Sequence, residues 1–260
     1  MTPHVVFISG GTSGINLGIA KGFAARGAKV LVFGRDGAKA DAAAAEIHAE
    51  TGSTVLAASA DVRDAAGIAD LFARATAALG APTVVIAGAA GNFMAPAVGI
   101  SPNGFKTVID IDLLGTYNVF RAAYDVVVKP GASLIAITAP QAEQPLPQQV
   151  HVCAAKAGVN MVVKVLAMEW GRAGIRVNAI SPGPILGTEG VERMAPTDAD
   201  KSAWTERTAI KRFGTPADIA NAAIFLSSPE GAYITGTILD CDGGMKLGDA
   251  SGDFLTPPSR

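Results

Sequence analysis

Short apolar runs alternate along this chain with longer stretches in which apolar residues recur at helical spacing. Short, continuously apolar runs are typical of parallel strands that are covered on both faces. The alternation therefore predicts an α/β fold, with a doubly wound, seven-stranded parallel sheet flanked by helices. We expect the strands at residues 4–9, 29–34, 54–59, 83–87, 132–138, 175–181 and 234–240.

Helical stretches fill the gaps between these runs, and several end at a glycine, as helix C-termini often do. We expect helices at residues 14–27, 36–52, 64–80, 104–129, 150–173 and 216–227. No linker, repeat or change of composition divides the chain, which predicts one domain over residues 1–248. Within it, residues 187–212 are more polar and follow the sixth strand, where a lid over a substrate is expected. Residues 249–260 show no periodicity and are expected to form an irregular tail.

The composition favours a globular protein with a large core over a nucleic-acid-binding or membrane protein. Hydrophobic residues make up 49% of the chain, charged residues 17%, and the net charge is -2, so a sizeable core is expected and nucleic-acid binding is not. Cys153 and Cys241 are far apart and lack metal-ligand spacing, which favours reduced thiols and no metal. No apolar stretch approaches the roughly 20 residues of a membrane span, and the N-terminus shows no signal peptide. A cytoplasmic protein is expected.

A glycine-rich turn joins the first strand to the first helix. Such a turn lets backbone N–H groups approach a pyrophosphate, whose charge the helix N-terminus favours. Glycine-rich turns also serve purely structural ends, but the position after the first strand favours a nucleotide site and a Rossmann-type sheet. The expected contacts are Gly10, Thr12, Ser13, Gly14, Ile15 and Asn16.

The end of the second strand indicates the cofactor. An acidic residue there would bind the ribose 2′-OH of NAD, but this chain has Gly34 followed by Arg35. Glycine leaves room for a 2′-phosphate and a guanidinium can pair with it, so we expect NADPH. The alternative interpretation is that Arg35 is a surface charge and Asp36 a helix cap.

These motifs resemble the short-chain dehydrogenase/reductase family, from Ser9 to about Gly244. The family's Thr-Gly-x-x-x-Gly-x-Gly pattern matches with Ser9 for the threonine and Asn16 for the third glycine. Asparagine tolerates unusual backbone angles, so we expect the turn to survive. The resemblance implies further cofactor contacts at Asp61, Val62, Gly88, Pro182, Gly183, Ile185 and Thr188.

The family's catalytic Asn-Ser-Tyr-Lys tetrad is largely replaced. Lys156 is unchanged, whereas the serine falls on Ala139, the tyrosine on Val152 and the asparagine on Asp112. Lys156 is expected to bond the nicotinamide ribose; the alternative is a lysine on a solvated helix face. An aliphatic Val152 cannot pass a proton, so any chemistry must do without a tyrosine.

The same losses characterise one branch of the family, the peroxisomal-type 2,4-dienoyl-CoA reductases of fatty acid β-oxidation. The selective segments are Ala90-Gly91-Asn92-Phe93, the aspartate at 112, and Gln149-Val150-His151 ahead of Ala155-Lys156. The resemblance implies an acyl-CoA thioester as the small-molecule substrate. It also implies a homotetramer built on the helices at 104–129 and 150–173, whose apolar residues cover more than one face; a large monomeric core is the alternative.

Reduction of a conjugated thioester explains why the tyrosine is dispensable. Hydride would add to the far carbon of the diene and charge would spread to the thioester oxygen, which needs hydrogen-bond donors there and a proton source at carbon. We expect Lys156 to orient the cofactor and Asp112 to act as the acid or as a relay through water. Asp242 is a second candidate, with a turn residue as the alternative. His151 cannot take the tyrosine's direction but is a further candidate.

Candidate substrate contacts are Gln141 and Gln148 at the thioester oxygen, and Asn92 and Phe93 along the acyl chain. Two other functions stay open. One is a divergent NADP(H)-dependent carbonyl or imine reductase for a ketone, ring compound or steroid, with Thr138, His151 or water replacing the tyrosine. The other is a non-catalytic NADPH-binding protein, which retention of Lys156 beside Asp112 disfavours.

Overall fold

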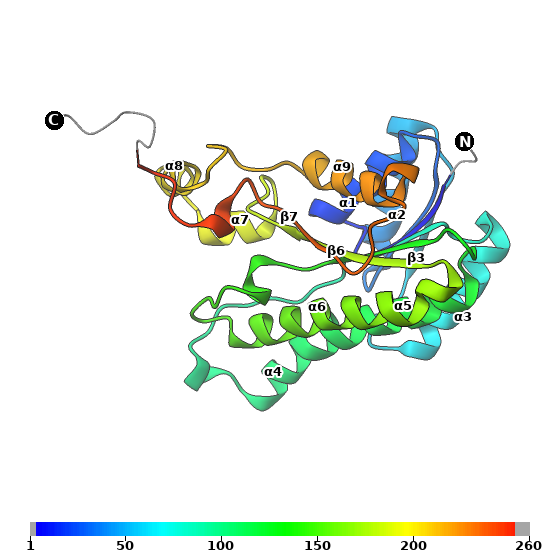
Figure 1. Ribbon diagram of the computed structural model, residues 1–260, viewed down its shortest axis with the longest axis horizontal. Coiled ribbons are helices and arrows are strands. Elements are labelled where there is room, and N and C mark those ends of the chain that lie inside the picture. Colours follow the sequence, from blue (N-terminus) through cyan, green and yellow to red (C-terminus); the bar gives the residue numbers. More distant parts are fainter. Residues whose placement is uncertain (1–3, 253–260) are drawn as a thin grey trace.

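The computed structural model describes residues 4–252, which form one seven-stranded, wholly parallel sheet flanked by helices (Figure 1). The strand order is β3-β2-β1-β4-β5-β6-β7, so the chain starts in the middle and winds outwards twice. The predicted doubly wound, Rossmann-type fold is confirmed. The strands are β1 (Val5–Ser9), β2 (Lys29–Gly34), β3 (Val55–Ser59), β4 (Val84–Ala87), β5 (Ser133–Ile137), β6 (Arg176–Pro182) and β7 (Ile238–Cys241).

Helices cover both faces of the sheet because the central strands are apolar on both sides. One core cluster joins β1, β4 and β2 to the helices α1, α2 and α9; the other joins the opposite face to α3, α5 and α6. Figure 1 shows these two groups above and below the sheet. The helices are α1 (Gly14–Ala24), α2 (Gly37–Thr51), α3 (Ala65–Leu79), α4 (Pro102–Val108), α5 (Gly115–Val126), α6 (Val150–Trp170), α7 (Glu189–Met194), α8 (Asp198–Arg207) and α9 (Pro216–Ser227).

The predicted strands agree with the structure to within about one residue, except the last. β7 begins at Ile238, whereas the prediction began at residue 234 and was wrong there. The segment before β7 still contacts β6 through both backbone and side chains. The N–H of Gly236 donates to the carbonyl of Val177, and Asn178 Nδ2 donates to the carbonyl of Ile234. An apolar run next to a sheet need not itself be a strand.

The helix predicted over residues 104–129 is present over residues 102–126, but it is not regular throughout. The segment starts at Pro102 and contains a π-helical turn, Ile109–Leu114, between α4 and α5. Turns of this kind are rare and are frequently found at functional sites. Asp112 lies in this turn and is 1% exposed.

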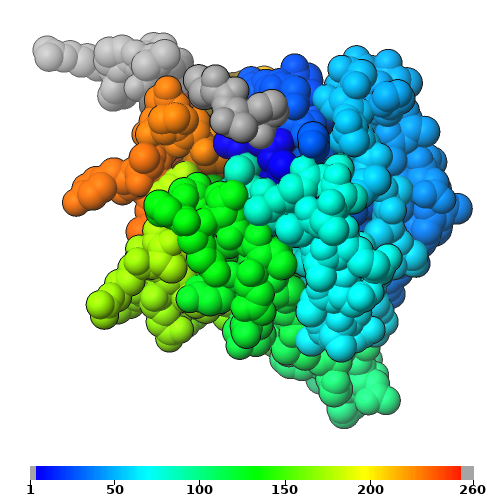
Figure 2. Space-filling view, turned by 90° about the vertical axis from the view of Figure 1, so that its right-hand side faces the viewer, coloured from blue at the N-terminus to red at the C-terminus, as the bar shows by residue number. Residues whose placement is uncertain are grey.

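Helix α6 is long and apolar enough, by length and composition alone, to cross a membrane. Half of the relevant window is buried inside the protein, however, against β6 and the π-helical turn. The sequence prediction that no stretch reaches this length therefore needs correction, and the burial identifies α6 as a core helix of the fold. Figure 2 shows its C-terminal end (yellow-green) beside the turn after α5 (green), where the N–H of Gly131 donates to the carbonyl of Gly174 at 2.8 Å.

The polar segment after β6 contains two short helices that the sequence analysis left unassigned. Both α7 and α8 start at a threonine N-cap, Thr188 and Thr197, and α8 has a full capping box with Asp200. They lie beyond the carboxyl end of the sheet, at the left of Figure 1. Residues 249–252 of the predicted irregular tail carry no helix or strand; the rest of it, 253–260, lies outside the described residues.

Candidate active site

The two residues that sequence analysis placed at the centre do meet. Lys156 projects from α6 and Asp112 from the π-helical turn, and Lys156 Nζ lies 3.1 Å from Asp112 Oδ2. Their side chains are 7% and 1% exposed. A solvated lysine, the alternative interpretation, does not fit this burial. A buried ion pair is held only if both charges keep a partner, because loss of either leaves an uncompensated charge.

Backbone groups fix both members of the pair. Lys156 Nζ donates to the carbonyl of Ile137, the last residue of β5, at 3.1 Å. Asp112 Oδ1 accepts from the N–H of Gly91, after β4, at 2.6 Å. Asp112 Oδ2 is close enough to Nζ for an ion pair but lacks the alignment of a hydrogen bond, and no other donor among the described residues reaches it. This oxygen retains the capacity to bond a further group.

Val152, which the family resemblance assigns to the tyrosine position, is 4% exposed and packs with Val108 and Ala155. Ala139, which the resemblance assigns to the serine position, lies just after β5, before the 3-10 turn Pro140–Ala142. Neither side chain has a polar atom. These two positions therefore offer no hydroxyl that could act as an acid, and the ionisable groups that the structure describes in this region include the Lys156–Asp112 pair and His151.

His151 is fully buried, and neither ring nitrogen has a hydrogen-bond partner among the described residues. Its ring lies against Phe93, with centroids 4.2 Å apart and planes at 35°. Phe93 also lies near Gly104, where a Cβ would come within 3.4 Å of the ring. Two of the predicted site residues, His151 and Phe93, thus contact each other.

Asp242 is 8% exposed, and backbone groups engage both of its oxygens. Oδ1 accepts from the N–H of Gly244 and Oδ2 from the N–H of Lys246, each at 2.8 Å. Gly243 and Gly244 have φ of 66° and 83°, which shape this turn. The geometry agrees with the turn residue considered as the alternative for Asp242.

A cleft of about 600 Å³ opens at the carboxyl ends of β1, β2 and β4, the usual ligand position in an open α/β sheet. Twelve of the fifteen predicted cofactor contacts line it, whereas Pro182 and Gly183 line a neighbouring cleft and Ile185 is buried in the core. Lys156 is among its lining residues, which joins the ion pair to the cofactor region. The twelve are Gly10, Thr12, Ser13, Gly14, Ile15, Asn16, Arg35, Asp61, Val62, Gly88, Lys156 and Thr188.

The glycine-rich turn has the shape that a dinucleotide phosphate requires. Gly10 has φ of 67°, and a Cβ there would lie 3.0 Å from backbone atoms of Ala89. Asn16, however, has ordinary helical backbone within α1, so its tolerance of unusual angles is not what preserves the turn. Its Nδ2 donates to the carbonyl of Gly88 at 2.8 Å, and its side chain occupies the space where a Cβ at Gly88 would lie.

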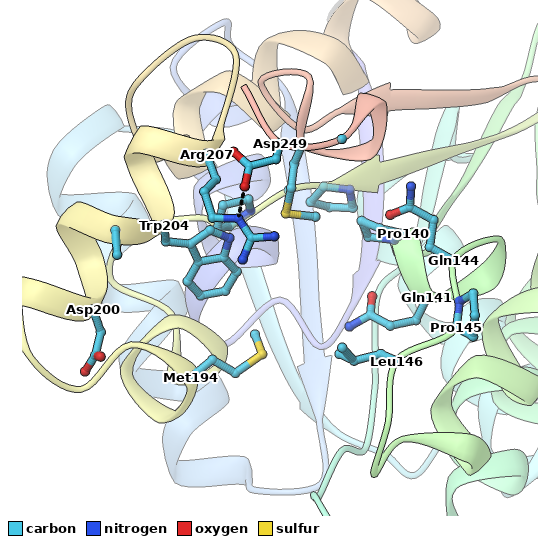
Figure 3. A pocket seen from close by; sticks show the side chains of 16 residues that line it. Pro140, Gln141, Gln144, Pro145, Leu146, Met194, Asp200, Trp204, Arg207 and Asp249 are labelled. Carbon is cyan, nitrogen blue, oxygen red and sulfur yellow. Dashed lines mark ion pairs between the residues drawn. The ribbon is translucent and has the colours of Figure 1, made fainter. Parts of the chain in front are cut away.

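A second cleft, of about 640 Å³, lies between the segment after β5 and the helices after β6 (Figure 3). Its lining includes Pro182, the last residue of β6, and Gly183, which were predicted as cofactor contacts but do not line the dinucleotide cleft. Five of its lining residues come from the segment 187–212, which was predicted as a lid, and sequence analysis did not single them out: Met194, Asp200, Ala203, Trp204 and Arg207. The large aromatic Trp204 in a mostly polar segment was the sequence feature that could have indicated a lining residue.

Of the predicted substrate contacts, one lines the second cleft and the others lie outside its lining. Gln141 lines the second cleft, and its Nε2 donates to Oε1 of the buried Gln149 at 3.1 Å. Gln148 has φ of 68°, and its carbonyl accepts from the N–H of Ala95. The carbonyl of Asn92 accepts from Arg193 of α7, which links the segment after β4 to the lid. Of the predicted substrate contacts, Gln141 is thus the one that lines the second cleft, where Gln144 also lies.

Residues 10–246 match the sequence model of a family described as enoyl-(acyl carrier protein) reductase. The chain belongs to the short-chain dehydrogenase/reductase family. It is 39% identical over 244 residues to the peroxisomal 2,4-dienoyl-CoA reductase [(3E)-enoyl-CoA-producing] of Pongo abelii, covering 94% of this chain and 84% of the relative. It is therefore an oxidoreductase of a family that uses a nicotinamide cofactor.

Two solved structures place the fold within the family. A short chain dehydrogenase from Bacillus anthracis is 37% identical, with a TM-score of 0.82, covering 94% of this chain and 96% of the other. An NADPH-bound short chain oxidoreductase from Pseudomonas aeruginosa PAO1, described as containing an atypical catalytic center, is 27% identical. Its TM-score is 0.85, with coverage of 93% and 96%. A short-chain reductase with a departure at its catalytic centre is thus among the chain's structural neighbours.

Proposed function

We propose that this protein is an NADPH-dependent 2,4-dienoyl-CoA reductase. The observation that carries the proposal is the buried Lys156–Asp112 pair beside a catalytic position that holds Val152. A ketone reductase needs a proton donor at the carbonyl oxygen, and the hydroxyl of the family's tyrosine is missing here. A conjugated thioester can be reduced without it, because the charge spreads over the whole conjugated system.

Three features support NADPH as the cofactor. Arg35 lines the dinucleotide cleft and has no ion-pair partner among the described residues. Asp36, the nearest carboxylate after β2, caps α2 by accepting from the N–H of Lys39 at 3.1 Å. Arg63 pairs with Asp61 and holds the pKa of that carboxyl below its usual range, chiefly through their side-chain hydrogen bonds. Arg35 is thus the guanidinium available to a 2′-phosphate.

The cofactor supplies a hydride when bound, and the chain's own residues govern everything else. Lys156 is positioned to bond ribose hydroxyls and to hold positive charge near the reacting face. Asp112 stabilises that charge at 3.1 Å and, through its unbonded Oδ2, can order a water molecule. In this proposal the Lys156 ammonium gives up a proton, which passes through the Asp112 carboxylate and that water to the substrate carbon, and Lys156 regains a proton from solvent. Gln141 Nε2 is a candidate donor to the thioester oxygen.

The test is NADPH oxidation with a 2,4-dienoyl-CoA, using the wild type, Asp112→Asn and Lys156→Met. Asparagine keeps the shape of the aspartate but cannot relay a proton, so we expect kcat to fall about 100-fold or more. Lys156→Met should raise KM for NADPH as well as lower kcat. The matched control is Lys164→Met, which removes an exposed lysine from the same helix.

Breaking a buried ion pair costs about 3–5 kcal/mol, so each variant's thermal unfolding must be followed alongside its kinetics. A folded Asp112→Asn protein that keeps wild-type turnover would remove Asp112 from the proton path. A wild type that binds NADPH but reduces no dienoyl-CoA would overturn the proposed function. Panels of ketones and imines would then decide between a carbonyl or imine reductase and a binding-only protein.

The remaining proposals concern assembly and location. A homotetramer is supported by the exposed apolar side chains on α5 and α6, among them Tyr117, Met161 and Met168. The cytoplasmic location stays a prediction from the sequence, and the Pongo abelii relative is itself named as peroxisomal.

A further inference from the structure

The second cleft has few charged side chains in its lining. Most of its lining is apolar or neutral, and its charged residues are Asp200, Arg207 and Asp249. Asp200 is used locally, because its Oδ2 accepts from the hydroxyl and the N–H of Thr197 in the capping box of α8. Arg207, the last residue of α8, is the one cation on this lining within the described part of the chain.

Arg207 is held across the mouth of the cleft by the segment after β7. Its Nε lies 3.1 Å from Asp249 Oδ2, and its carbonyl accepts from the N–H of Ala250. The two side chains are 67% and 49% exposed, so the ion pair is open to solvent and contributes little to stability. Figure 3 shows the terminal nitrogens of the guanidinium pointing into the cleft, on the wall opposite Gln141 and Pro145. Asp249 thus contacts Nε, and the two terminal nitrogens of Arg207 face the cleft.

We propose that Arg207 is a binding subsite for the phosphate groups in the coenzyme A half of the substrate. This inference rests on the proposed function and adds to it the residue that selects a coenzyme A ester. Such an ester has an apolar acyl chain at one end and phosphates at the other. The cleft offers partners for both: hydrocarbon from Pro140, Leu146 and Met194, and a guanidinium fork that fits phosphate oxygens in pairs.

The phosphates of the cofactor are the other source of the same chemistry. Arg207 is not among the residues that line the dinucleotide cleft, where Arg35 lies. The subsite therefore faces the substrate, and substitution of Arg207 leaves the Kd for NADPH within about twofold of the wild-type value.

Substitution of Asp249 should affect phosphate binding in the direction opposite to substitution of Arg207. Its Oδ2 and an incoming phosphate compete for one guanidinium, while its Oδ1 accepts from the N–H of Ser251. Asp249→Asn weakens the competitor and removes a negative charge that repels the phosphate. If the ion pair only held the segment after β7 against α8, both substitutions would raise KM for the coenzyme A ester. Loss of either Arg207 or Asp249 would break the same contact.

The experiment compares two substrates that carry one dienoyl group, the coenzyme A thioester and the N-acetylcysteamine thioester, which has no phosphate. The variants are Arg207→Ala, Asp249→Asn and the control Arg74→Ala, which breaks a similarly exposed ion pair with Asp70 on α3. Arg207→Ala raises KM for the coenzyme A ester about tenfold more than KM for the short ester, with kcat changed little. Asp249→Asn lowers KM for the coenzyme A ester or leaves it unchanged, and Arg74→Ala alters neither substrate selectively.

Equal effects of Arg207→Ala on both thioesters would overturn the subsite while leaving the proposed function intact. A rise in KM for the coenzyme A ester with Asp249→Asn, as large as that with Arg207→Ala, would identify a lid latch instead. Failure of the wild type to reduce either thioester would remove the proposed function, and this inference with it. A tenfold weaker Kd for NADPH in Arg207→Ala would assign the guanidinium to the cofactor.

Discussion

At the scale of single residues, Asn16 shows how one substitution changes its surroundings. It stands where the family has a glycine, and its side chain fills the space next to Gly88 and bonds the Gly88 carbonyl. The start of α1, after the glycine-rich turn, and the end of β4 are thereby held together. Position 88 must stay small because position 16 is large, a dependence that neither position reveals alone.

This dependence can be measured with a double-mutant cycle. Gly88→Ala alone forces its Cβ into the Asn16 side chain, so we expect a loss of about 1–3 kcal/mol in the free energy of unfolding and weaker NADPH binding. In an Asn16→Gly background the same substitution should cost much less, because the space is open. Urea unfolding of the four proteins gives the coupling; additive effects would show that the two side chains do not meet.

A second residue-scale prediction concerns the cofactor. Arg35→Ala removes the guanidinium proposed to bind the 2′-phosphate, and a charge-assisted bond of this kind is worth about 1.5–3 kcal/mol. We expect the Kd for NADPH to rise at least tenfold while that for NADH changes little. Fluorescence titration with both cofactors measures this, and equal losses for the two would show that Arg35 does not read the phosphate.

At the scale of elements, the π-helical turn Ile109–Leu114 is what places Asp112. A regular helix could be predicted over this segment from its apolar spacing, but the wider turn could not. It follows from packing: the segment lies against α6, and a Cβ at Gly158 of α6 would come within 2.8 Å of Leu113. The residue could thus be selected from sequence, whereas its direction depended on the neighbouring helix.

The start of α9 gives an element-scale prediction with a pH dependence. Asp218 accepts from Arg212 and from the cap residue Thr215, and the Arg212 hydrogen bond chiefly holds the pKa of Asp218 well below its usual 3.8. Because the folded-state pKa is depressed, this contribution is complete above pH 4 and is lost as the pH falls towards the folded-state pKa.

We expect Asp218→Asn to lower stability by about 1 kcal/mol at pH 7, as loss of a helix cap does. The difference from the wild type should shrink below pH 4. Thermal unfolding at pH 7 and at pH 3 measures both values. A difference that stays constant with pH would show that the carboxylate's charge plays no part.

At the scale of the whole molecule, parallel strands bring the site together. The carbonyl of Ile137 ends β5, Gly91 follows β4, and Lys156 and Asp112 come from the helices on one face. Because β4 and β5 are neighbours and parallel, their carboxyl ends meet at one edge of the sheet. The lid helices and the segment after β7 then close the second cleft at that same edge.

The apolar stripe on α6 predicts how whole molecules assemble. Met161, Val165 and Met168 recur at helical spacing and are 59%, 42% and 83% exposed. We expect a mass in solution that is a multiple of 26.3 kDa. The double substitution Met161→Glu/Met168→Glu should lower it, because a buried interface cannot accommodate unpaired charge. Light scattering measures the mass, and Val98→Glu, on a fully exposed loop residue, is the control.

The sequence by itself determined the alternation of strands and helices, the phosphate turn, the position of Lys156 and the choice of Asp112 as its partner. These features depend on spacing along the chain and on the chemistry of single side chains. The tertiary structure decided that Asp112 turns towards Lys156, that the oxygens of Asp242 are engaged by its own turn, and that Asp249 meets Arg207. Those outcomes depend on how segments far apart in the sequence pack together, which a local pattern of residues does not determine.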